Sequence, residues 1–130
     1  MKYADSFRKV FTCSATGTTQ YSDWFDISWA NEIYSWLTFS ETGTADAETI
    51  DVTLERYVPY VTPTATTVLT HTQATGATNE EKYGGWMTDT AAPGAENKLG
   101  TRVRYKCVAG GTFGSGNVIT VTMILHAKRN

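Results

Sequence analysis

The sequence predicts an all-β protein, an antiparallel β-sandwich or jelly roll of about eight strands. Apolar and polar side chains alternate with a period of two along most of the chain, which is typical of half-buried strands. Turn-forming residues separate these alternating segments, and no segment shows a helical period. Threonine is the commonest residue, and its β-branched side chain suits the exposed face of a sheet.

The first half of the chain contains four of the expected strands. Their ranges are 6–13, 20–28, 33–39 and 49–57. In three of them, apolar residues at every second position are expected to face the core. These inward residues are Phe7, Phe11, Cys13, Ile33, Leu37, Phe39, Ile50, Val52 and Leu54. Trp36 falls between two of them and is expected to face outward.

The second half contains four more expected strands, with the ranges 66–72, 82–88, 99–109 and 117–127. Pro59 and Pro63 precede them, and because proline lacks a backbone donor, we expect this stretch at a sheet edge or in a connection. The last two strands alternate most strictly. The glycine-rich segment 110–116 lies between them, and we expect it to form a hairpin turn with positive φ angles.

The length of 130 residues predicts one domain. We expect a single β-sandwich domain at 7–130, preceded by a flexible N-terminal arm at 1–6. The start of the chain is polar and does not have the pattern of a signal peptide, and no apolar run is long enough to span a bilayer. The chain is therefore expected to be made in a cytoplasm and to involve no membrane.

Two cysteines, Cys13 and Cys107, both fall at inward positions of expected strands. Two interpretations stay open. Either the two cysteines form a disulfide that ties the first strand to a late one, or they pack as two small apolar side chains with free thiols. The second is favoured, because a chain without an export signal folds in a reducing compartment.

Composition and motif spacing argue against an enzyme. The net charge of −2 offers no basic surface for direct binding of nucleic acid. His71 and His126 are not spaced with Cys, Asp or Glu as zinc ligands are, and no Gly-x-Ser-x-Gly motif occurs. Asp23 and Asp26 lie three residues apart on an expected strand, so they would point to opposite faces and could not act as a catalytic pair. We therefore expect no catalytic residues and no cofactor.

One acidic segment leaves a metal-binding alternative open. Asp46, Glu48 and Asp51 could supply carboxylate oxygens to a calcium ion, which favours such ligands on loops. A solvated acidic loop is the commoner role of a segment of this kind. We therefore expect no metal site here.

Aromatic side chains are the best candidates for binding a partner. Exposed rings can stack on sugars or anchor a protein interface, where Trp and Tyr are enriched, whereas buried rings only fill the core. The outward position of Trp36 and the placement of Tyr83–Met87 between two loops favour a contact surface. The candidate partner-binding residues are Lys2, Tyr3, Trp36, Tyr83, Trp86 and Met87.

Several strings in the chain resemble small virion structural proteins of tailed bacteriophages. They are Thr49-Ile-Asp-Val-Thr-Leu-Glu-Arg56, Thr67-Val-Leu-Thr-His-Thr-Gln73, Leu99-Gly-Thr-Arg-Val-Arg-Tyr105, Gly110-Gly-Thr112, Val118-Ile-Thr-Val-Thr122 and Ala127-Lys-Arg129. The resemblance is a pattern of strands and turns and has no catalytic signature.

The resemblance implies a capsid decoration protein, a β-sandwich that is made in the host cytoplasm and works in the virion. Such a protein binds the major capsid protein, stabilises the head and often forms a homotrimer. The arm at 1–6 would then add a strand to the sheet of a neighbour. The alternative function is a carbohydrate-binding module or a host-adhesion protein with exposed aromatic residues.

Overall fold

The computed structural model describes residues 4–43, 47–58, 62–75, 81–88 and 101–129, which form ten β-strands. The strands are β1 (Ala4–Cys13), β2 (Thr19–Tyr21), β3 (Phe25–Asp26), β4 (Glu32–Thr42), β5 (Glu48–Val58), β6 (Thr62–Thr70), β7 (Ala74–Thr75), β8 (Glu81–Thr88), β9 (Arg102–Gly111) and β10 (Val118–Lys128). The all-β prediction is confirmed. Within the described part of the chain, no helix has the length and apolar character needed to cross a membrane.

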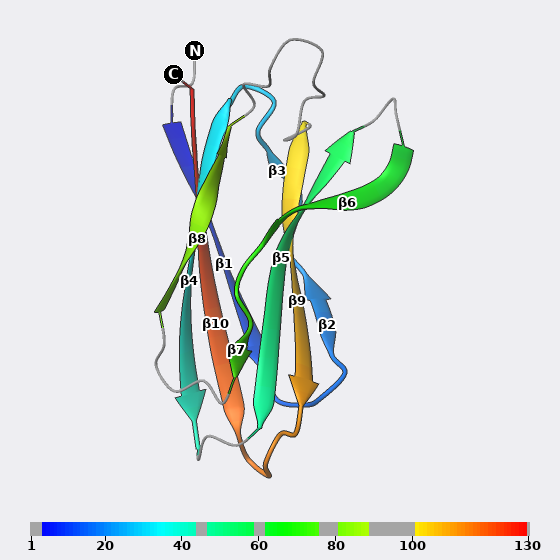
Figure 1. The fold of residues 1–130 in the computed structure, drawn as a ribbon, viewed down its shortest axis with the longest axis vertical. Helices are drawn as coiled ribbons and strands as arrows, with labels where there is room; N and C mark the ends of the chain where they lie inside the picture. Colours follow the sequence, from blue (N-terminus) through cyan, green and yellow to red (C-terminus); the bar gives the residue numbers. More distant parts are fainter. Residues whose placement is uncertain (1–3, 44–46, 59–61, 76–80, 89–100, 130) are drawn as a thin grey trace.

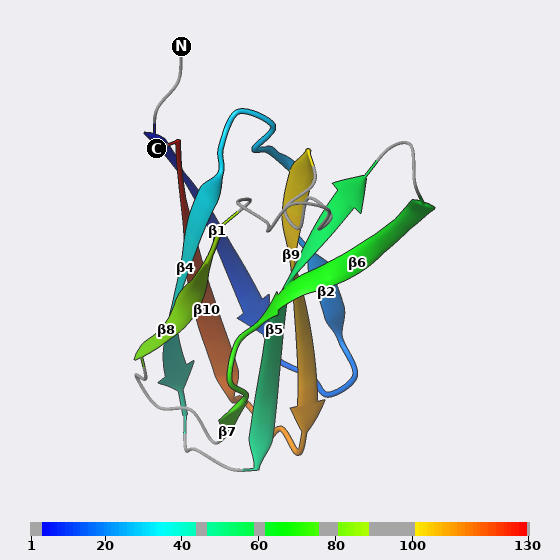
Figure 2. The ribbon, with the colours of Figure 1, turned by 45° about the horizontal axis from the view of Figure 1, so that its top comes forward.

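The strands form two antiparallel sheets that pack face to face (Figures 1 and 2). The first sheet has the order β1-β10-β4-β8. The second has the order β2-β9-β5-β6, with β3 also paired to β9 and β7 also paired to β5. This arrangement is the expected antiparallel β-sandwich.

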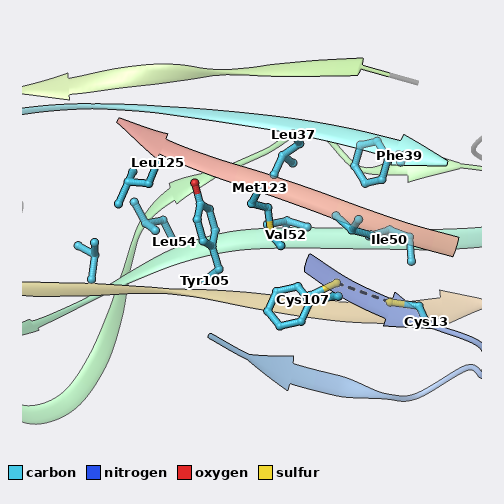
Figure 3. Close-up of a cluster of buried hydrophobic side chains, with 14 of the residues drawn as sticks. Cys13, Leu37, Phe39, Ile50, Val52, Leu54, Tyr105, Cys107, Met123 and Leu125 are labelled. Atoms are coloured by element: carbon cyan, nitrogen blue, oxygen red, sulfur yellow. Dashed lines mark hydrogen bonds between the residues drawn. The ribbon is translucent and has the colours of Figure 1, made fainter. Parts of the chain in front are cut away.

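The core lies between the two sheets and is built by the alternation seen in the sequence. In β9 every second residue from Val103 to Ala109 is buried, and β10 shows the same pattern from Ile119 to Ala127. The inward residues of β4 and β5 meet them in one hydrophobic cluster (Figure 3). Burial of this apolar surface is the main force that holds the two sheets together.

The last two strands do not form the expected hairpin. β9 pairs with β2, β3 and β5 in the second sheet, whereas β10 pairs with β1 and β4 in the first. The glycine-rich link therefore crosses between the sheets. Gly111 and Gly116 have φ angles of 72° and 79°, so the expected positive φ angles are confirmed.

The segment expected as one strand at 20–28 is divided into β2 and β3. At the break, the side chain of Ser22 replaces a backbone acceptor of the ladder, and the register against β9 shifts by one residue. The Tyr105 N–H donates to Ser22 Oγ at 2.8 Å, and the Ser22 N–H donates to the Tyr105 carbonyl at 3.0 Å. The strand expected at 66–72 instead begins at Thr62 as β6, which lies at the edge of the second sheet as Pro63 requires.

The boundary of the expected N-terminal arm also needs correction. β1 begins at Ala4, which pairs with Lys128, and Ser6 pairs with His126. Residues 4–6 are therefore part of the first sheet, where they already have a partner strand in their own chain. Residues 1–3 lie outside the described residues.

Candidate docking surfaces

The outer face of the first sheet carries three exposed apolar side chains on three adjacent strands. Val10 of β1 is 37% exposed, and Trp36 of β4 and Ile124 of β10 are each 43% exposed. Trp36 lies directly opposite Ile124 in the strand register, and Val10 lies opposite Thr122 on the same face. We call these three residues the apolar patch. Apolar side chains gathered in this way on an outer sheet face are typical of a contact surface.

The surroundings of the apolar patch are polar and include the exposed Arg8 of β1, which lies opposite Ile124 in the strand register. Hydroxyl-bearing residues continue the face on all three strands: Ser6, Thr12, Thr38, Ser40, Thr42, Thr120 and Thr122. At the end of the face near Lys128, the ammonium lies 3.7 Å from a carboxylate oxygen of Glu32, which also accepts a 2.6 Å hydrogen bond from Tyr34. Hydroxyl groups cost less to desolvate than charged groups, and a partner can offset that cost with hydrogen bonds.

Four of the six predicted contact residues lie on β4 and β8 of the first sheet. Trp36 is exposed, as its position in the alternation predicted. β8 lies beside β4 at the edge of the first sheet, with Tyr83 opposite Trp36 and Trp86 opposite Tyr34. Met87 is opposite the buried Ile33, beyond a register shift between Tyr34 and Ser35. Lys2 and Tyr3 lie outside the described residues.

The outer face of the second sheet carries an aromatic–arginine cluster that the sequence analysis missed. It consists of Tyr21, Trp24, Tyr57, Arg102 and Arg104. The Arg104 guanidinium carbon lies 4.1 Å from the centre of the Tyr21 ring and 4.6 Å from that of Trp24. Arg102 lies 4.6 Å from the centre of the Tyr57 ring, and Trp24 meets Tyr57 edge to face at 5.8 Å. These cation–π contacts hold the side chains in place.

Charge on this second face is partly neutralised. Arg104 Nε donates to Glu55 Oε1 at 2.9 Å across the β5–β9 ladder. Arg102 and Arg104 alternate along β9 with the buried Val103 and Tyr105, so the sequence pattern places both arginines on the outer face. The rings come from the β2–β3 segment and from β5, and strand alternation does not predict which strands become neighbours.

A polar network lies inside the core. Ser35 Oγ is 2.7 Å from His71 Nε2 and 2.5 Å from the Tyr105 hydroxyl. Burial lowers the pKa of His71 to about 4 and raises the pKa of Tyr105 well above its ordinary range. The pairing of a serine with a neutral histidine is found in hydrolases, but both side chains are buried here. The contacts give Ser35 Oγ, His71 Nε2 and the Tyr105 hydroxyl hydrogen-bond partners, but His71 Nδ1 is buried without one.

The acidic residues considered for calcium do not converge. Glu48 is fully buried and accepts a 2.7 Å hydrogen bond from Asn117 Nδ2, whereas Asp51 points outward and accepts from Gln73 Nε2 at 2.9 Å. Asp46 lies outside the described residues. Among the residues that the structure describes, no group of three or more His, Cys, Asp or Glu side chains could hold a metal ion.

Comparisons with known proteins show the fold. No family model and no curated protein matches the chain. A chain in the structure of infectious bursal disease virus, Gx strain, matches with a TM-score of 0.51 and 11% identity, over 98% of this chain and 37% of that one. This chain thus spans little more than a third of the length of that viral chain.

Two further structures match less closely. The infectious bursal disease virus VP2 subviral particle has a TM-score of 0.46 and 10% identity, over 98% of this chain and 38% of that one. A CBM4 structure has a TM-score of 0.47 and 11% identity, over 92% of this chain and 82% of that one.

Proposed function

We propose that this chain is a non-enzymatic structural protein of a virion, a capsid decoration protein of a bacteriophage. In this role it binds the major capsid protein, associates with further copies of itself as a homotrimer, and stabilises the head. The observation that carries the proposal is the apolar patch of Val10, Trp36 and Ile124 on the outer face of the first sheet. The shared fold with a chain of a virus structure is consistent with it.

The patch suits a repeated contact better than a single tight one. Three half-exposed side chains bury too little area for a stable complex between two molecules. On a symmetric shell, however, each oligomer would make several such contacts at once, and avidity would multiply them. A rigid sandwich also orders few side chains on binding, so little entropy opposes each contact.

The test compares two aromatic residues of similar exposure on opposite faces. Trp36 in the first sheet is 43% exposed, and Tyr21 in the second is 46% exposed. We expect Trp36→Glu to weaken co-sedimentation with heads assembled without this protein by tenfold or more, because a central Trp anchor contributes at least that much. Tyr21→Glu is expected to bind within a factor of two of the wild type.

Light scattering on the purified protein tests its oligomeric state. We expect a mass three times the 14.3 kDa of one chain. Equal binding by the wild type and Trp36→Glu would disprove docking through the first sheet. A stable monomer would disprove the trimer.

Carbohydrate binding is a second candidate function, favoured by the aromatic–arginine cluster. Tyr21 presents a half-exposed ring on which Arg104 stacks, and the nearby arginines offer donors to hydroxyl groups. A glycan array tests this function. Binding that is lost in Tyr21→Ala and kept in Trp36→Ala would place a sugar site on the second sheet. Loss in Trp36→Ala alone would place it on the first, and no bound glycan would reject this candidate.

A further inference from the structure

We propose that Cys13 and Cys107 form a redox pair that closes into a disulfide between the two sheets. Both residues have free thiols, and their Sγ atoms lie 3.8 Å apart in the core. Figure 3 shows the two side chains pointing toward each other across the space between β1 and β9. The inference is independent of the proposed function.

The two backbones already bring the sulfurs close to bonding distance. Cys13 pairs with Ile119 in the first sheet, and Cys107 pairs with Gln20 and Val52 in the second. A disulfide bond needs the sulfurs about 2 Å closer than they are, a movement that side-chain rotation and a small shift of the end of β1 can supply. Because the two residues belong to different sheets, the bond would join the layers covalently.

Burial directs the reaction to this pair. Cys13 is 1% exposed and Cys107 is fully buried, so a thiol of a second molecule cannot reach either in the folded state. Gln20 Nε2 donates a 3.7 Å hydrogen bond to Cys13 Sγ, which favours negative charge on that sulfur. The contact with Cys107 lowers the pKa of Cys13, and the same contact and burial raise the pKa of Cys107. Together with the Gln20 hydrogen bond and the position of β1 at the sheet edge, this makes Cys13 the attacking thiolate.

Glutathione disulfide is a sufficient oxidant. The Cys13 thiolate attacks one sulfur of the reagent, which breaks its S–S bond, forms a mixed disulfide and releases one glutathione thiolate. Cys107 loses its proton and attacks Cys13 Sγ, so the protein S–S bond forms and the second glutathione leaves. The two protein thiols supply two electrons and two protons, and two molecules of reduced glutathione result.

Access to Cys13 requires the end of β1 to open. β1 lies at the edge of the first sheet, so it can separate without breaking the rest of the ladder. We therefore expect slow oxidation of the folded protein and fast oxidation during refolding. Once formed, the bond links residues 94 apart in the chain and restricts the unfolded state.

The experiment refolds the whole chain from denaturant with glutathione disulfide present. We expect each chain to have lost two hydrogens by mass spectrometry in denaturant, to have no free thiol and to have no covalent bond to another chain. Its melting temperature is expected to be roughly 5–15 °C above that of the reduced protein.

A matched variant moves one thiol by a single residue. Cys13→Ser combined with Thr12→Cys turns the thiol to the outer face, since Thr12 is exposed. This variant is expected to form no internal disulfide and to show no rise in melting temperature. Two titratable thiols in the refolded wild type, or disulfides formed only between chains, would overturn the proposal. So would an equal rise in the variant.

Discussion

At the scale of single residues, the core of this sandwich contains one polar network with an energetic consequence. His71 is buried beside Ser35 and Tyr105 and has a pKa of about 4, against an ordinary value of about 6.5. The folded state therefore keeps His71 neutral at pH values where the unfolded chain would bind a proton. Stability is unaffected by this residue above about pH 6.5 and decreases as the pH falls toward 4.

We predict that His71 accounts for a measurable part of acid destabilisation. Over the interval from about pH 6.5 to about pH 4, its contribution to the free energy of unfolding falls by about 3 kcal/mol. Urea denaturation of His71→Gln at several pH values is expected to show a correspondingly smaller loss. His126→Gln is the control, because His126 lies on the outer face beside Ser6. Equal pH profiles for wild type and His71→Gln would contradict this prediction.

At the scale of elements, the link that carries the chain from β9 to β10 depends on backbone conformation. Gly111 at the end of β9 has a φ of 72°, and a Cβ atom there would lie 2.0 Å from the carbonyl oxygen of Ala47. Gly116, before β10, has a similar φ of 79° but no atom within 4 Å of its Cβ position. Both glycines thus require a positive φ angle, and they differ only in the space available for a Cβ atom.

Substitution of these two glycines by alanine distinguishes the cost of backbone strain from the cost of steric overlap. Gly116→Ala is expected to reduce the free energy of unfolding by about 1 kcal/mol, the cost of a left-handed conformation for alanine. Gly111→Ala is expected to cost at least twice as much, because the Ala47 backbone must also move away. Chemical denaturation measures the free energy of unfolding of both variants. Equal losses in the two variants would show that the link adjusts freely around Ala47.

At the scale of the whole molecule, the sandwich presents two outer faces of different chemistry. The first sheet has the apolar patch among hydroxyl groups, and the second has stacked arginines and aromatic rings. Packing of the two sheets leaves both faces outward. Under the proposed function, the first face would contact the shell, and the second would be left for other copies of the chain or for solvent.

Under the proposed function, association through the apolar patch should resist salt. At about 1 M NaCl the screening length is about 3 Å, which removes most surface electrostatic attraction while apolar contacts persist. We expect the affinity for heads to change by less than a factor of three between low salt and that concentration. Co-sedimentation measures it. A tenfold loss would indicate that charged side chains, and not the apolar patch, make the contact.

Much of the architecture could be predicted from side-chain alternation. Val103, Tyr105 and Cys107 face the core because they share a strand face, and Trp36 is exposed because it lies between two inward residues. The division of 20–28 into two strands was not predictable, since it depends on Ser22 bonding to Tyr105, far away in the sequence. The aromatic–arginine cluster was missed for the same reason.

Side-chain alternation was enough to predict the fold class, the inward face of the clearest strands and the exposure of Trp36, because all of these follow from a period of two within one segment. Which strands are neighbours became apparent only in the folded sandwich. It separated β9 from β10 and brought Cys13 to Cys107 and Ser35 to His71. Alternation specifies which face of a strand is buried, but long-range pairing depends on how all the strands fill one core together.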